Sequence, residues 1–264
     1  MSDVLVPAVP AWFQNGFHRF LRPFLKRHFQ AVAVESESHE RLAFAADEPL
    51  IIYGNHPSWW DPLIAHFLNR SLFPERQFYA PIDADALEQY SVFGKLGFYG
   101  VRMNTTSGAA GFLKQTTAIL KSGHSAVWIT PEGRFADVRD HDAELMPGLA
   151  HICKKMDVGK VVPLALEYPF WEERLPLCLA MFGKPVSIAE NQGRSKQEWR
   201  DRLSAELRGT QQQLSQLVIG RSSEPFDDLL KGKTGAGMFY DSFRRTRSLF
   251  SRKKFRHQHG EQFE

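Results

Sequence analysis

Short apolar segments of strand type alternate along this chain with longer segments of helical periodicity, and this alternation limits the folds that it can adopt. Strands joined by helices favour a largely parallel sheet. We therefore expect an α/β fold, a single domain with a mixed, largely parallel sheet flanked by helices. The expected strands are 31–35, 50–53, 77–80, 98–102, 125–129, 161–167 and 177–182, and the expected helices lie within 11–30, 58–69, 108–122, 147–156 and 195–217.

The composition is that of a globular protein, with 43% hydrophobic and 24% charged residues among 264. The net charge of only +3 gives no overall reason to expect nucleic acid as a partner, and we expect none. Cys153 and Cys178 form neither a Cys-x-x-Cys pair nor a zinc-binding spacing, and no His-Glu-x-x-His motif is present, so we expect no metal. The chain also has no Gly-x-Gly-x-x-Gly motif, and we expect no cofactor. Neither a signal peptide nor a long apolar run is visible, which predicts a cytoplasmic protein without a transmembrane helix.

Both ends of the chain combine basic and aromatic residues. Residues 1–30 are expected to contain an N-terminal amphipathic helix, bent at Pro23, that either lies in a membrane interface or packs on the core. Residues 221–264 are expected to form a basic C-terminal tail, because residues 242–258 contain seven basic residues interleaved with apolar ones. Such a tail favours an anionic membrane surface over nucleic acid. Residues 31–220 are then the folded domain.

A histidine follows one expected strand, and an aspartate comes five residues later, near the start of the next helix. Ligands bind at the carboxyl ends of strands in open α/β sheets, which is where His56 is expected. Asp61 can hold the proton on one imidazole nitrogen, which leaves the other nitrogen free to accept a proton from a substrate hydroxyl. Alternatively, Ser58 and Asp61 form a helix capping box and His56 bonds only to the backbone. The spacing alone leaves both alternatives open.

Charged residues also follow two further expected strands. Glu132 and Arg134 flank Gly133, and a glycine at this place lets a ligand approach the backbone closely. Arg134 can form a forked pair with a phosphate or carboxylate, or it can pair with Glu132 within a turn. Arg102 ends the expected strand 98–102, where a lone arginine is usually solvated or paired with an acidic side chain.

Taken together and in order, these segments resemble the glycerophospholipid acyltransferase family, which includes the lysophospholipid and 1-acylglycerol-3-phosphate acyltransferases. That family carries four sequence blocks, and the chain matches them over about residues 50–170. Their order and spacing are much more specific than any one block. The matches are Asn55, His56 and Asp61 in the first block, Gly97 to Arg102 in the second, Pro131, Glu132 and Gly133 in the third, and Val161, Val162, Pro163 and Leu164 in the fourth.

The resemblance implies a glycerol-phosphate acyltransferase-like fold. It also implies transfer of a fatty acyl group from a co-substrate, acyl-CoA or acyl carrier protein, to a hydroxyl, often that of a glycerol phosphate. It assigns His56 as the general base and Asp61 as the residue that orients it. It implies that the substrate-binding residues are Asn55, Arg102, Glu132, Gly133 and Arg134.

The chain departs from the family pattern at two points. The third block usually has a threonine or serine between the glycine and the arginine, whereas Arg134 follows Gly133 directly. A lysine that often precedes the second block is absent from residues 79–83. Lysophosphatidic acid is therefore one acceptor among several, alongside a neutral lipid hydroxyl or a glycolipid.

We expect an enzyme of lipid metabolism and phospholipid biosynthesis that is peripherally associated with the membrane. Its expected partners are an acyl thioester donor, a lipid acceptor and a membrane surface, which the N-terminal helix and the basic tail would contact. The first alternative is a non-catalytic membrane-surface lipid-binding protein on the same fold. The second assigns the basic tail to nucleic acid, with phenylalanines for base stacking.

Overall fold

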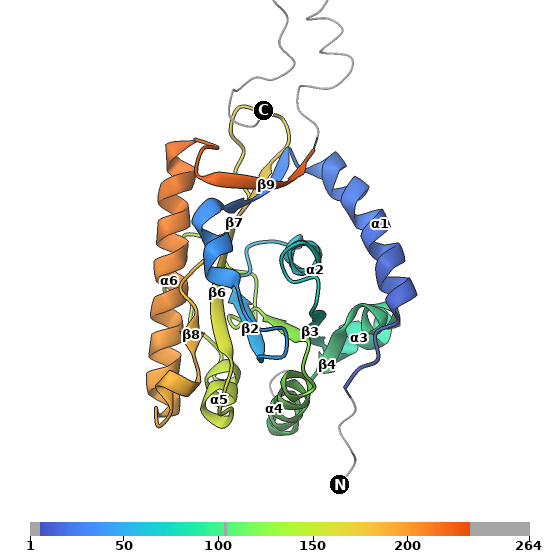
Figure 1. The fold of residues 1–264 in the computed structure, drawn as a ribbon, viewed down its shortest axis with the longest axis vertical. Coiled ribbons are helices and arrows are strands. Elements are labelled where there is room, and N and C mark those ends of the chain that lie inside the picture. The colour runs from blue at the N-terminus through green and yellow to red at the C-terminus, as the bar shows by residue number, and fades with distance from the viewer. Residues whose placement is uncertain (1–5, 103–104, 233–264) are drawn as a thin grey trace, which may run out of the picture.

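The computed structural model describes residues 6–102 and 105–232, and its fold is drawn in Figure 1. The α-helices are α1 (Ala11–His28), α2 (Asp61–Leu72), α3 (Ala84–Gln89), α4 (Thr106–Lys121), α5 (Gly148–Lys155) and α6 (Lys196–Gly220). Short 3-10 helices are η1 (Ser36–Leu42), η2 (Ser91–Leu96) and η3 (Ala189–Asn191). The strands are β1 (Ala31–Glu35), β2 (Leu50–Gly54), β3 (Gln77–Asp83), β4 (Phe98–Val101), β5 (Ser125–Ile129), β6 (Lys160–Glu167), β7 (Leu177–Phe182), β8 (Val186–Ser187) and β9 (Phe226–Lys231).

The described strands form one mixed sheet in the order β4-β3-β5-β2-β6-β7-β1-β9, with β8 also paired to β6. Neighbouring strands from β4 to β6 are parallel, as are β7 and β1. The pairs β6–β7, β6–β8 and β1–β9 are antiparallel. The predicted α/β fold with a mixed, largely parallel sheet flanked by helices is therefore confirmed.

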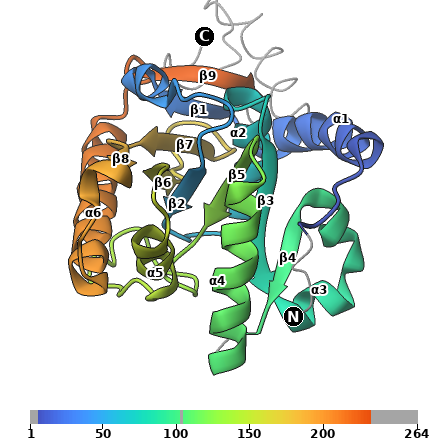
Figure 2. The same cartoon turned by 60° about the horizontal axis from the view of Figure 1, so that its bottom comes forward.

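Helices cover both faces of this sheet. Leu50 and Ile52 of β2 face buried side chains of α1 and α2, whereas Ile51 and Tyr53 face those of α4, α5 and α6. Alternate residues of a strand point to opposite faces, so β2 is buried along its whole length. Figure 1 shows α1 and α6 on opposite sides of the molecule, and Figure 2 shows the same arrangement from another direction.

Five parallel strands end at one edge of the sheet, because β4, β3, β5, β2 and β6 run in the same direction. His56 follows β2, Arg102 follows β4, Glu132 follows β5 and Tyr168 follows β6. The fold therefore gathers the residues after these strands at the carboxyl edge, where α/β proteins bind their ligands.

Two helices differ from the sequence-based expectation. Helix α2 begins at Asp61 rather than at Ser58. Pro62 lies in its first turn, where the backbone N–H that proline lacks would have no partner within the helix. Helix α3 was not expected; the side chain of Asp83 caps it by accepting hydrogen bonds from the backbone N–H groups of Asp85 and Ala86. Helix α2 has no side-chain cap at Trp60, whereas the short α3 has the Asp83 cap, and neither feature is visible in the apolar periodicity.

The predicted boundary of the folded domain at residue 220 is wrong, because part of the expected 221–264 tail belongs to the sheet. Strand β9 pairs with β1 in antiparallel fashion, and Phe226 and Leu230 are buried. Asp227 between them and Lys231 after them are exposed, and these charged positions gave the strand the appearance of a tail segment. The basic run 242–258 lies outside the described residues.

Helix α1 continues through Pro23, and its inner face packs on the core. Leu21 and Leu25 are fully buried there. Of the two alternatives for this helix, packing on the core therefore holds for its inner face. Membrane contact by its outer face stays a prediction. Among the helices of the described part of the chain, none combines the length and the hydropathy needed to cross a membrane.

Gly97, in the second sequence block, adopts a backbone conformation that other residues avoid. Its φ is +96°, and a Cβ atom there would lie 2.1 Å from the carbonyl oxygen of Phe78. Gly97→Ala is therefore expected to lower the free energy of unfolding by at least about 2 kcal/mol in urea denaturation. Gly94→Ala is the control, because its Cβ would meet no atom within 4 Å. Equal losses in the two variants would contradict this steric explanation.

Candidate active site

His56 and Asp61 are in direct contact at the carboxyl edge of the sheet. Nδ1 of His56 lies 2.6 Å from Oδ2 of Asp61, and the two side chains are 18% and 5% exposed. A carboxylate can only accept a hydrogen bond, so Nδ1 carries the proton. Nε2, on the opposite side of the ring, then points away from Asp61 with a free electron pair. The strand end of β2 and the start of α2 thus assemble a histidine of fixed tautomer.

The carboxylate of Asp61 accepts two further hydrogen bonds. The backbone N–H of Ser58 donates to Oδ2 at 3.1 Å, and the hydroxyl of Tyr168 donates to Oδ1 at 2.6 Å. Asp61 also lies at the N-terminus of α2, where the helix dipole favours a negative charge. The Ser58 hydroxyl bonds instead to the N–H of Trp60, so only one half of the expected capping box forms. Capping and orientation of His56 are therefore compatible roles of one carboxylate.

Asn55 joins β2 to β6. Its side-chain amide donates to the carbonyl oxygen of Leu166 at 3.0 Å, and its side-chain oxygen accepts from the N–H of Leu166 at 2.9 Å. Asn55 is buried. Both polar ends of the side chain are thus used within the protein, and Asn55 fixes the strand end that carries His56.

The loop after β5 lies against His56. The ring of Phe135 is 4.3 Å from the imidazole ring, centroid to centroid, and the N–H of Ala136 donates to the carbonyl oxygen of His56 at 3.0 Å. Phe135 is itself largely exposed. This loop therefore places an apolar ring beside the histidine at the surface of the protein.

Glu132 pairs with Arg208 of α6, not with Arg134. Its Oε1 accepts a hydrogen bond from Nη1 of Arg208 at 2.7 Å, and the Glu132 side chain is only 1% exposed. Arg208 also donates to the side chain of Gln211 at 2.6 Å and to the carbonyl oxygen of Ala143. The alternative in which Glu132 pairs with Arg134 within the turn is therefore wrong. The buried pair instead ties the loop after β5 to α6.

Of the remaining predicted residues, the two arginines are exposed and the glycine allows a turn of the backbone. Arg134 is largely exposed and donates to Oδ2 of Asp140 at 3.0 Å. Gly133 has a φ of +65°, a value that glycine adopts readily. Arg102 is exposed at the end of β4, three strands away from β2 in the sheet. The structure thus brings His56 and Asp61 together, whereas Arg102 and Arg134 are exposed to solvent at the carboxyl edge of the sheet.

Three residues of the site were not expected from the sequence: Tyr168, Phe135 and Arg208. Tyr168 directly follows β6, so its position at a strand end was a signal that could have been used. Phe135 follows the third sequence block, but its contact with His56 depends on the course of the loop. Arg208 lies within a long polar helix, where no local pattern marks it as buried.

Burial raises the pKa of several groups near the site. Burial, the Cys178 thiol and the Asp61 carboxylate raise the pKa of Tyr168 well above its usual value. Burial and the same carboxylate raise the pKa of Cys178. Burial also raises the pKa of Glu167, the last residue of β6, to about 7. The phenol and the thiol are therefore neutral over the physiological pH range.

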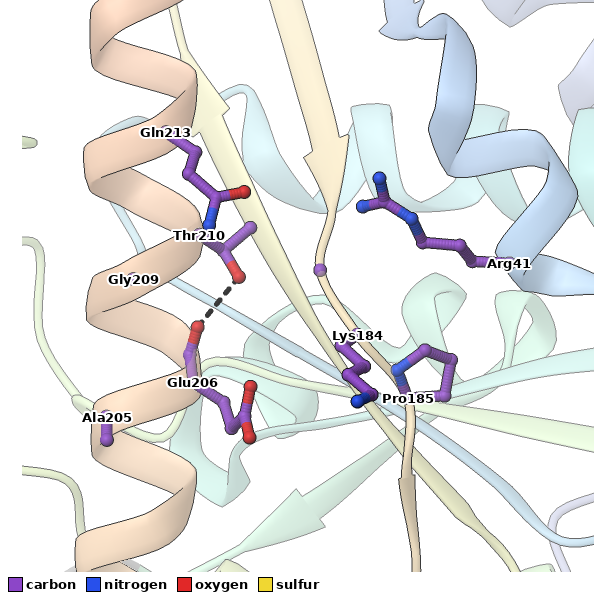
Figure 3. A pocket seen from close by; sticks show the side chains of 9 residues that line it. Arg41, Lys184, Pro185, Ala205, Glu206, Gly209, Thr210 and Gln213 are labelled. Atoms are coloured by element: carbon purple, nitrogen blue, oxygen red, sulfur yellow. Dashed lines mark hydrogen bonds between the residues drawn. The ribbon is translucent and has the colours of Figure 1, made fainter.

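A surface pocket of about 540 Å³ lies elsewhere, between η1, the β7–β8 junction and α6 (Figure 3). Arg41, Lys184 and Thr210 are among its lining residues, and none of the predicted site residues lines it. Within residues 6–102 and 105–232, no cluster of three or more His, Cys, Asp or Glu side chains is arranged to hold a metal ion.

The fold and the site define an α/β protein in which a buried carboxylate orients a histidine at the carboxyl edge of the sheet. A model of the family described as Acyltransferase matches residues 33–167, slightly more than half of the chain. The chain therefore belongs to this acyltransferase family, that of the lysophospholipid and glycerolipid acyltransferases. A comparison with curated proteins finds no match. The family confirms the predicted resemblance and indicates acyltransferase activity in general.

The Glu132–Arg208 pair predicts a large loss of stability when only one charge is removed. Arg208→Met would leave the Glu132 carboxylate buried without its partner and lower the free energy of unfolding by about 3–5 kcal/mol. The double variant Glu132→Gln with Arg208→Met should recover part of this loss. Urea denaturation of the single and double variants measures both effects.

The control for this prediction is Arg221→Met. Arg221 pairs with Glu172 at 3.0 Å, but both side chains of this pair are well exposed. Removal of an exposed pair is expected to change stability by less than about 1 kcal/mol. A similar small effect at Arg208 would show that the buried pair does not hold the loop.

Proposed function

We propose that this protein is an O-acyltransferase that moves a fatty acyl group from an acyl thioester, acyl-CoA or acyl carrier protein, to a hydroxyl of a glycerolipid or related lipid. The observation that carries the proposal is the 2.6 Å contact between His56 Nδ1 and Asp61 Oδ2 in a chain of the acyltransferase family. This contact leaves Nε2 as a general base at the carboxyl edge of the sheet. No cofactor is needed for a transfer in which the hydroxyl attacks the thioester directly.

In the proposed mechanism, the acceptor hydroxyl donates a hydrogen bond to Nε2 of His56. The hydroxyl oxygen attacks the thioester carbonyl carbon as its proton passes to Nε2. Asp61 stabilises the imidazolium that forms, because its buried carboxylate lies 2.6 Å from Nδ1. The tetrahedral intermediate then expels the thiolate, which takes the proton from His56. The products are an ester and a free thiol, and the base is restored.

The other predicted site residues divide into two groups in this proposal. Arg102 and Arg134 are exposed cations at the same edge of the sheet, suited to anionic groups of the donor or the acceptor. Asn55 and Glu132 are buried and bonded to Leu166 and Arg208, so we assign them to holding the two loops. Gly133 lies in the loop after β5, and its positive φ supports the turn there.

The test is acyl transfer from labelled acyl-CoA, or labelled acyl carrier protein, to a panel of lysolipids, neutral lipid alcohols and glycolipids. His56→Ala is expected to lower kcat by about 10²–10⁴-fold, which is the usual contribution of general-base catalysis. His39→Ala is the control, because His39 is an exposed histidine in η1, away from the strand ends that carry the site. Full activity of His56→Ala would rule out the proposed mechanism.

We further propose that the outer face of α1 contacts an anionic membrane surface. Trp12 and Phe20 are 73% and 57% exposed, and the exposed basic residues on the same helix include Arg19 and Lys26. A helix with exposed aromatic and basic side chains can lie in the membrane interface. The described helices are too short or too polar to span a membrane, so this contact would be peripheral.

The double variant Trp12→Ala with Phe20→Ala is expected to weaken binding to vesicles containing anionic lipid by at least about tenfold, since two large apolar side chains are lost. Sedimentation with vesicles of phosphatidylcholine and phosphatidylglycerol measures the change. Ile219→Ala removes an equally exposed apolar residue from the C-terminal end of α6 and should have little effect. Vesicle binding without any acyl transfer would favour the alternative, a non-catalytic lipid-binding protein.

A further inference from the structure

We propose that Tyr168 is a positioning residue that acts through Asp61 on His56. Its hydroxyl lies 2.6 Å from Oδ1 of Asp61, while Oδ2 of the same carboxylate is bound to His56. The role rests on the proposed function, because it concerns the tautomer and orientation of the proposed base. The Tyr168 hydroxyl bonds to Asp61 and not to the imidazole, so Tyr168 is not itself a catalytic residue.

The carboxylate of Asp61 is held from both sides. Oδ2 accepts from His56 and from the backbone N–H of Ser58, and Oδ1 accepts from Tyr168. Asp61 is buried, so water cannot readily replace a lost donor. Rotation of the carboxylate moves both oxygens together, so it would break the Tyr168 contact along with those of His56 and Ser58. The tyrosine therefore restricts the carboxylate to the orientation in which Oδ2 faces Nδ1.

The hydroxyl of Tyr168 is a permanent donor. Burial, the Cys178 thiol and the Asp61 carboxylate raise the pKa of Tyr168, so the phenol stays protonated over the physiological pH range. Cys178 is fully buried and also stays protonated. Oδ1 of Asp61 therefore faces a protonated hydroxyl donor over the physiological pH range.

The aromatic ring of Tyr168 is fixed by its neighbours. Its centroid lies 5.9 Å from that of Phe29, and Phe29 lies 4.9 Å from Trp60 in an edge-to-face arrangement. Trp60 immediately precedes Asp61. The contacts therefore link the end of β6, the end of α1 and the start of α2 around one carboxylate.

The tautomer of His56 provides a measurement that needs no substrate. A neutral histidine carries its single ring proton on Nδ1 or on Nε2, and the hydrogen bond made by one nitrogen decides between them. With Asp61 held in place, Nδ1 carries the proton and Nε2 is free to act as a base. If Oδ1 loses its donor, Asp61 can turn, and a fraction of His56 is expected to carry its proton on Nε2.

The first experiment compares ¹⁵N spectra of the histidine rings in the wild type and in Tyr168→Phe. The His56 signals are identified by their loss in His56→Gln. We expect one tautomer, protonated on Nδ1, in the wild type and a mixture in Tyr168→Phe. Tyr53→Phe is the matched control, because Tyr53 is a buried tyrosine of β2 whose hydroxyl donates to the carbonyl oxygen of Leu203 at 2.9 Å. A wild-type tautomer in Tyr168→Phe would overturn the proposal.

The second experiment measures kinetics in acyl transfer. Tyr168→Phe is expected to lower kcat about tenfold with little change in KM, since an orientation needed only for the chemical step is lost. In the Asp61→Asn background the same substitution should have no further effect on kcat. Independent losses in the two backgrounds would show that Tyr168 does not act through Asp61.

A third variant covers the case in which Tyr168→Phe does not fold. Site-specific incorporation of 3-fluorotyrosine at position 168 keeps the hydroxyl, and its ¹⁹F signal is expected to shift in Asp61→Asn and in His56→Gln. An unchanged signal in both variants would overturn the proposal. Because the tautomer and the ¹⁹F signal require no substrate, Tyr168 can retain its role even if the panel of lipids shows no acyl transfer. The two proposals can therefore fail separately.

Discussion

The buried carboxylate of Asp61 is the interaction on which the arrangement of the site depends. It receives donors from two segments that are far apart in the sequence: His56 and Ser58 in the loop between β2 and α2, and Tyr168 after β6. A buried charge is stable only when its hydrogen bonds are satisfied, so the fold must bring these segments together. The parallel neighbours β2 and β6 do this, since both strands end at the same edge.

A second buried pair organises the other side of the same edge. Glu132 and Arg208 connect the loop after β5 to α6, while Phe135 and Ala136 of that loop lie against His56. The two buried carboxylates thus have different tasks. Asp61 fixes the histidine, and Glu132 fixes the loop that lies over it.

Much of the fold and the centre of the site could be predicted from the sequence because their signals are local. Apolar runs and helical periodicity mark the strands and helices, and the spacing from His56 to Asp61 places both residues beside one helix start. Arg208 could not be assigned, since its role depends on which helix packs beside β5. The position of Tyr168 at a strand end was visible, but its contact with Asp61 depends on β6 pairing with β2. Asn55 could be recognised as part of a sequence block, but its bonds to Leu166 follow from the order of strands in the sheet.

Strand β9 has a consequence for the order in which the protein can assemble during synthesis. Ala31 of β1 pairs with Lys231 of β9, 200 positions further along the chain, and β1 also pairs with β7. Contacts of such long sequence separation form late and slow the folding of a domain. Until the ribosome has released β9, one edge of β1 has open backbone groups that can pair with another chain. The pairing of β9 therefore decides when β1 ceases to be an open edge of the sheet.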